Sequence, residues 1–279
     1  MNKRSFITVL ISVVLALSFI LATGCANKNE PSSAEITTTE IAETTEPEAE
    51  NTTAFELTTA VPEESTTEIT EEETTDVIPS TVEEIVAYFN ESANKIKPNA
   101  KKVVKNFEKR IANEEKYIIP ESLDGVAKSM SKTFMKDDTD PIYYETREDI
   151  RNEFIVPNQD YVSKLKAEYV KEATCKDNGN EYEIYLKLKD QKNPTAGVGV
   201  GAVCDVIEGF EVSEKSSIVK KFTTEYYNCE IKATVDKETG NIIHIVYKTP
   251  VLLEMTVDMF GTHDVAVGFT FVKDYSVTY

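Results

Sequence analysis

The last third of the chain alternates apolar and polar residues with a period of two, and this pattern constrains the fold more than any other feature. Because successive side chains of a strand point to opposite faces of a sheet, the pattern predicts antiparallel strands with one buried and one wet face. Residues 236–241 and 261–264 have the composition of the connecting turns. The expected buried face comprises Ile243, Ile245, Tyr247, Val251, Leu253, Met255 and Val257, then Val265, Val267, Phe269, Phe271, Tyr275 and Val277.

A helix is expected at the start of the folded part. Ser80 and Glu83 have the spacing of a capping box, in which the two side chains satisfy free backbone N–H groups at the helix start. Apolar residues then recur every three or four positions as far as Ile96. Pro98 predicts the end of this helix, because proline cannot donate a backbone hydrogen bond.

The segments between this helix and the last strands are less regular. A second helix is predicted after Pro120, with Ser122 as its cap, and a further short helix over 161–173. Residues 99–112 fit either a helix or an edge strand, whereas alternation from residue 181 predicts a strand. The fold class expected is α+β, with N-terminal helices packed on a curled antiparallel β-meander of four or more strands. Pro250 predicts a bulge or bend in the longest strand.

Residues 26–80 differ sharply from the rest of the chain. They hold 15 acidic residues against one basic residue, four prolines and a single aromatic residue, in short repeats of threonine and glutamate. Such a segment cannot bury enough apolar surface to offset an ordering cost of about 1–2 kcal/mol per residue. We therefore expect a disordered stalk over 25–80, after a signal peptide over 1–24 and before one α+β domain over 81–279.

The N-terminus has the pattern of an export signal. Lys3 and Arg4 precede an apolar run over residues 6–22, and the sequence Leu-Ala-Thr-Gly-Cys follows at 21–25. This motif resembles the lipobox of bacterial lipoproteins. The resemblance implies that Cys25 receives a diacylglycerol. This lipid would anchor the protein to the outer face of the cell membrane. The alternative, an uncleaved transmembrane helix near the lower limit of about 17 residues, gives the same extracytoplasmic location.

The segments 173–179, 182–188, 227–231 and 235–240, with a tyrosine-rich last strand, carry a second resemblance. Together they resemble the C-terminal domains of uncharacterised surface lipoproteins of single-membrane bacteria, and that resemblance implies no activity. A helix on a curled antiparallel sheet is also similar in outline to the half-barrels of lipid-carrier lipoproteins. That likeness concerns the fold alone.

The chain has four cysteines. If Cys25 is lipidated, Cys175 and Cys229 are the first candidates for a disulfide, because oxidising conditions prevail outside the membrane. The alternative is that these two and Cys204 are free, buried thiols. No Cys-x-x-Cys spacing indicates a zinc site.

No other residues form a recognisable catalytic group. His244 and His263 lack an evident nucleophile nearby, so both are expected at the surface. The glycines of 197–201 lack the spacing of a phosphate-binding loop, which favours a flexible loop. The acidic residues of 137–140 lack the ligand order of an EF-hand, which favours a solvated loop over a calcium site. We expect no catalytic residue, cofactor or metal.

The net charge of −19 argues against nucleic acid as a partner. The function expected is therefore a lipid-anchored, non-enzymatic surface domain that binds a hydrophobic ligand, an envelope polymer or a surface protein. An enzyme acting on the cell wall or another extracellular polymer through an unrecognised carboxylate pair is the alternative, as is a purely structural surface protein.

Overall fold

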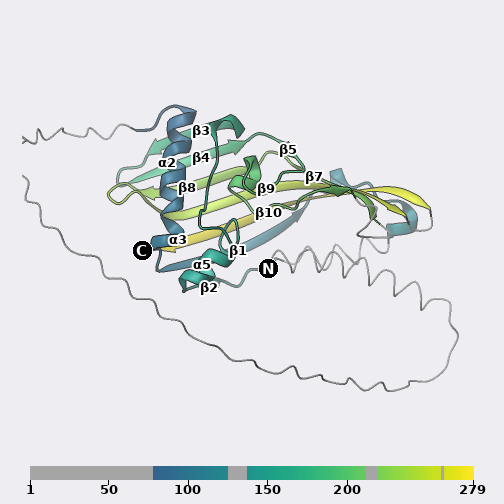
Figure 1. The fold of residues 1–279 in the computed structure, drawn as a ribbon, viewed down its shortest axis with the longest axis horizontal. Coiled ribbons are helices and arrows are strands. Elements are labelled where there is room, and N and C mark those ends of the chain that lie inside the picture. Colours follow the sequence, from purple (N-terminus) through teal and green to yellow (C-terminus); the bar gives the residue numbers. More distant parts are fainter. Residues whose placement is uncertain (1–77, 125–136, 212–218, 259–260) are drawn as a thin grey trace, which may run out of the picture.

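The structure is a computed structural model that describes residues 78–124, 137–211, 219–258 and 261–279 (Figure 1). Cys25, the predicted signal peptide, almost all of the predicted stalk and most of the helix predicted after Pro120 lie outside these residues. The helices are α2 (Val82–Asn94), α3 (Ile96–Asn99) and α5 (Arg147–Glu153), with 3-10 turns at Glu114–Lys116, Glu121–Leu123, Ala167–Tyr169 and Gly199–Ala202.

Ten strands form one antiparallel sheet. The strands are β1 (Lys102–Ala112), β2 (Ile142–Tyr144), β3 (Val170–Asp177), β4 (Glu181–Leu188), β5 (Gln191–Lys192), β6 (Phe210–Glu211), β7 (Val219–Tyr226), β8 (Glu230–Asp236), β9 (Asn241–Asp258) and β10 (Thr262–Thr278).

The main strand order is β2-β1-β10-β9-β8-β4-β3, while β7 pairs with β9, β5 and β6. The prediction of helices before a large antiparallel sheet is confirmed. The sheet is more than a meander, because the first long strand, β1, pairs with the last, β10, and β4 pairs with β8. This arrangement brings the start and the end of the folded part side by side.

Helix α2 begins one residue later than the capping pattern predicts. The capping box joins Thr81 and Glu84 rather than Ser80 and Glu83. The Glu84 carboxylate accepts hydrogen bonds from the backbone N–H groups of Thr81, at 3.0 Å, and Ser80, at 2.9 Å. These bonds, Thr81 first, lower the pKa of Glu84 to about 2, because they favour its ionised form.

The segment 99–112, whose sequence fits either a helix or an edge strand, contains strand β1. The helix predicted over 161–173 is wrong. That segment is extended, makes one 3-10 turn and continues as edge strand β3. The amide side chain of Asn94 holds it: Oδ1 accepts from the backbone N–H groups of Val162, at 2.8 Å, and Ser163, at 3.0 Å, while Nδ2 donates to the Ser163 carbonyl. Backbone groups further along are bound to other segments: Lys164 N donates to the Ala202 carbonyl, Tyr169 O accepts from Lys189 N, and the residues from Val170 onward pair with β4.

Pro250 lies inside the unbroken strand β9 and causes no register shift with β10. On its other side, β9 pairs with β8 as far as Lys248 and with β7 from Val251 onward. Pro250 falls at this change of partner, where its carbonyl accepts from Tyr227 N at 3.2 Å. Proline is tolerated because no ladder bond requires an N–H at this point.

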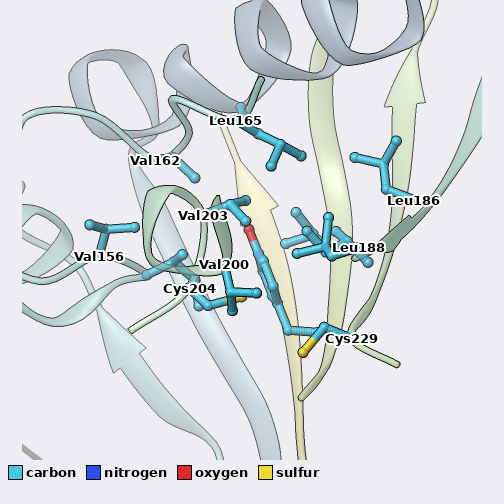
Figure 2. Packing of buried hydrophobic residues seen from close by; sticks show 14 of the residues in the cluster. Val156, Val162, Leu165, Leu186, Leu188, Val200, Val203, Cys204 and Cys229 are labelled. Atoms are coloured by element: carbon cyan, nitrogen blue, oxygen red, sulfur yellow. The ribbon is translucent and has the colours of Figure 1, made fainter. Parts of the chain in front are cut away.

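Two connecting segments complete the core beside α2. Figure 2 shows Val156, Val162 and Leu165 of one segment, and Val200, Val203 and Cys204 of the other, approaching the sheet residues Leu186 and Leu188. The glycine-rich segment 197–201 is therefore part of the packed core, with Val200 only 1% exposed, and not the flexible loop expected. Positive φ angles at Gly197 (84°) and Gly199 (54°) allow the turn.

Candidate functional site

Cross-strand pairing identifies the side chains that share the face covered by α2, which we call the inner face. One row crosses seven strands on this face and shows that it runs from edge to edge of the sheet. Its members are Cys175, Ile184, Ala233, Ile245, Tyr275, Lys105 and Ile142. The next row contains Tyr247, Lys273 and Glu108 side by side.

Helix α2 lies near one end of the sheet, whereas β9 and β10 run far past it (Figure 1). On this far half, the inner face carries five apolar residues that are only half-buried, although they pack against the edge of the core. We call these residues the inner stripe: Met255, Val265, Val267, Phe269 and Phe271. Phe269 and Phe271 meet edge to face, with ring centroids 5.1 Å apart.

The prediction of the β9 and β10 faces needs two corrections. Ile242, not Ile243, is fully buried, because a register shift between β8 and β9 falls between Thr234 and Val235. On β10 the more deeply buried side of the far half is the outer one, which includes Ala266 and Gly268. The segment that follows β1 bonds to the Ala266 and Gly268 backbones and places the side chains of Asn113 and Lys116 against Gly268. On the far half of β10 the predicted apolar face is therefore the less buried one, whereas on β9 the predicted positions Val251, Leu253 and Val257 are buried.

Charged residues lie at the end of the inner stripe nearest the core, and we call them the polar belt: Lys105, Glu108, Arg110, Asp138 and Lys273. Lys105 Nζ lies 3.2 Å from Glu108 Oε2 and 3.3 Å from Asp138 Oδ2. Arg110 binds Glu108 Oε1 through its guanidinium at 2.9 Å. The acidic segment 137–140 thus contributes an ion pair to the sheet, where a solvated loop was expected.

The polar belt strongly favours an ionised Glu108. Burial alone would raise the pKa of this carboxyl, which is 8% exposed, but Lys273, Lys105 and Arg110 together lower the pKa to about 2. Lys273 differs from the other two cations. Among the described residues it has no carboxylate within 4 Å; its Nζ lies 5.8 Å from the Phe271 ring centroid, against the inner stripe.

A buried phenol lies beside this lysine. Tyr247 is directly opposite Lys273 in the β9–β10 pairing and is 1% exposed. Its Oη has no hydrogen-bond partner in the described part of the chain. Burial raises the pKa of Tyr247, with a smaller contribution from Cys204, and Lys273 acts on the pKa of the same thiol. Tyr247, Cys204 and Lys273 therefore share one neighbourhood.

The cysteines of the described residues are all free thiols. Cys175 lies on β3 and Cys229 just before β8, with β4 between them. The register also offsets them by about four residues, or roughly 13 Å, beyond the separation of about 7 Å that a disulfide tolerates. The predicted Cys175–Cys229 pair is not formed in this structure. Burial raises the pKa of Cys204 to about 12, so its thiol is protonated and inert at neutral pH.

The two histidines are not brought together. His244 lies on the outer face, where Nε2 is 3.1 Å from both carboxylate oxygens of Asp274. Asn106 donates to the same carboxylate at 2.7 Å and to Ser276 Oγ at 2.9 Å. The structure records no bond from His244 to the Ser276 hydroxyl in these residues, so the base-to-nucleophile contact of a hydrolase is not assembled here. His263 is paired with Val257 on β9 rather than placed in a turn.

No group of three or more His, Cys, Asp or Glu residues in the described ranges could hold a metal ion. Within the same ranges, none of the helices combines the length and apolarity needed to span a bilayer. Comparison of the chain with protein-family models, curated proteins and solved structures gave no match. The fold is that of an α+β domain, in which a helix covers part of one face of a large antiparallel sheet.

Proposed function

We propose that this protein is a lipid-anchored, extracytoplasmic binding module, without enzymatic activity, that holds an elongated hydrophobic ligand on the inner stripe. The curled sheet with its helix at one end acts in this proposal as a half-open cradle. The observation that carries the proposal is the half-buried state of Met255, Val265, Val267, Phe269 and Phe271. Large apolar side chains left partly in water along one line are typical of an interaction site.

The shape of the inner stripe favours a chain-like ligand. Alternate residues of β10 from Val265 to Phe271 form its length, which at about 3.4 Å per residue is roughly 20 Å. Met255 widens it by only one strand. A narrow apolar line of this length suits an acyl chain better than a compact ring system. Each methylene that the ligand buries contributes about 0.8 kcal/mol.

Binding of a neutral hydrophobic probe to Val267→Asp tests the proposal. The test uses the chain from Ala26 onward, which retains every residue of the described core. A carboxylate in the middle of the inner stripe would have to be desolvated by an apolar ligand. We expect the affinity for N-phenyl-1-naphthylamine, measured by fluorescence titration, to fall at least about tenfold.

The matched control is Val272→Asp, which places the same charge on the same strand but on the outer face, where Val272 is also half-buried. We expect this variant to bind the probe like the parent chain. Equal probe affinities for both variants, or no saturable binding by the parent, would contradict the proposal. Circular dichroism on both variants confirms that the sheet is retained.

The extracytoplasmic, lipid-anchored location of the protein is proposed from residues 21–25, which resemble a lipobox. Cys25→Ser is expected to remove the lipid attachment, so that the protein appears in the medium or accumulates as an uncleaved precursor. Cell fractionation with intact-mass measurement checks this outcome, and Cys175→Ser, a change within the folded domain, serves as the control. Unchanged mass and membrane retention of Cys25→Ser would refute lipidation at this residue.

A further inference from the structure

We infer that the ligand of the inner stripe is a long-chain carboxylate, with its apolar chain along the stripe and its anionic head group bound by Lys273. This inference rests on the function proposed above and adds the chemical class of the ligand. It follows from the position, the charge and the neighbours of one lysine.

Lys273 stands at one end of the inner stripe. On β10, residues 265, 267, 269 and 271 are the inward-facing apolar positions, and Lys273 occupies the next inward position. Its Nζ is 5.8 Å from the Phe271 ring centroid, so the ammonium group borders the last aromatic ring. A ligand whose chain covers Val265 to Phe271 therefore brings its terminal group to this ammonium.

Lys273 is the cation of the polar belt with the least direct contact to a carboxylate, although it lies opposite Glu108 on β1 and lowers the pKa of that carboxyl. Lys105 and Arg110 both contact Glu108, at 3.2 Å and 2.9 Å, and Lys105 also contacts Asp138. Lys273 has no carboxylate within 4 Å among the described residues, although it lies half-buried. A half-buried cation is stabilised by an anion that arrives with its own apolar chain, because the pair is then shielded from water.

The residue opposite Lys273 does not compete for the head group. Tyr247 is its cross-strand neighbour on the inner face, but its side chain is 1% exposed, so its hydroxyl lies inside the core. The head group therefore meets the ammonium of Lys273, to which a carboxylate brings the opposite charge. A neutral or cationic head group would make no charge-assisted hydrogen bond to it.

Palmitate and its methyl ester provide the test, because they share one chain and differ in charge. Isothermal titration of the chain from Ala26 onward at pH 8 is expected to show palmitate binding at least about tenfold more tightly than methyl palmitate, the usual scale of one charge-assisted hydrogen bond. Lys273→Met should remove this preference while leaving the affinity for methyl palmitate unchanged. Lys273→Arg should retain the preference.

Lys109→Met is the control, because Lys109 is exposed on the outer face of β1, opposite Val272. It should bind both ligands like the parent chain. If the parent binds palmitate and its ester equally, or Lys273→Met keeps the preference, the inference fails while the proposed function stands. If neither ligand binds any chain but the sheet is intact, the proposed function fails as well.

Discussion

Single residues in this protein carry charge onto the largely apolar face of the sheet, and Lys273 does so at a position with the phase of the predicted apolar residues. Lys105, Glu108 and Lys273 all face the side of the sheet that α2 covers. Buried ion networks gain little stability on balance, because desolvation opposes the attraction between the charges. Stability therefore does not explain why these charges lie at one end of the apolar inner stripe, and we relate them to ligand binding instead.

The ionisation of Glu108 gives a prediction at this scale. Its pKa is about 2 in the folded protein, against an ordinary value of 4.5, so its stabilising contribution is complete above pH 4.5 and is lost as the pH falls toward 2. Between pH 7 and pH 3 the parent should lose about 2 kcal/mol more stability than Glu108→Gln. Urea unfolding at the two pH values measures the difference. Equal losses in both proteins would show that the belt does not favour the ionised carboxylate.

Lys97 illustrates a residue role that the sequence conceals. It is 5% exposed, and its ammonium donates to the carbonyls of Arg151, Val156 and Gln159 at 2.9–3.2 Å. Burial lowers its pKa to about 8, with a smaller contribution from Arg151. Val156 has φ 55°, a conformation that a β-branched residue rarely adopts. Nothing in the local sequence distinguishes this lysine from a solvated one, because its partners are backbone groups 54–62 residues away.

At the scale of the elements, the sequence predicts what local periodicity determines. Helix α2, strand β4 and the turn between β8 and β9 follow from apolar spacing and from glycine and aspartate in the turn. The predicted helix over 161–173 fails because contacts with Asn94 and with β4 decide its backbone, and these partners are distant in sequence. Pro250 causes no register shift with β10; it falls where β9 changes partner from β8 to β7, and that change is a property of the whole sheet.

The sheet edges show how the same elements avoid self-association. The edge strand β3 carries charges of alternating sign, Lys171, Glu172, Lys176 and Asp177. The other outer strands are short: β2 has three residues, and β5 and β6, which pair with β7, have two each. Charged and short edges are the usual protection against strand addition by another chain. The edges therefore contribute little to binding, which leaves the faces of the sheet as the surfaces of interest.

For the whole molecule, the sequence predicts the α+β class, one folded domain at the C-terminal end and an apolar face on the last strands. It does not predict that β1 closes onto β10, since this pairing joins residues more than 150 positions apart. The candidate site depends on that closure, because it places Glu108 and Arg110 beside Lys273 and Phe271. One signal was available in the sequence: residue 273 has the phase of the apolar positions, yet it is a lysine.

The central claim is that the inner stripe holds an apolar chain, and a ligand retained from the cell tests it most directly. Native mass spectrometry of the chain from Ala26 onward, exported by the cell and purified without detergent, should show a fraction of molecules carrying an acyl ligand. Val267→Asp, prepared in parallel, should be free of it. A parent chain that carries no apolar ligand, and that takes none up when incubated with palmitate, would contradict the account.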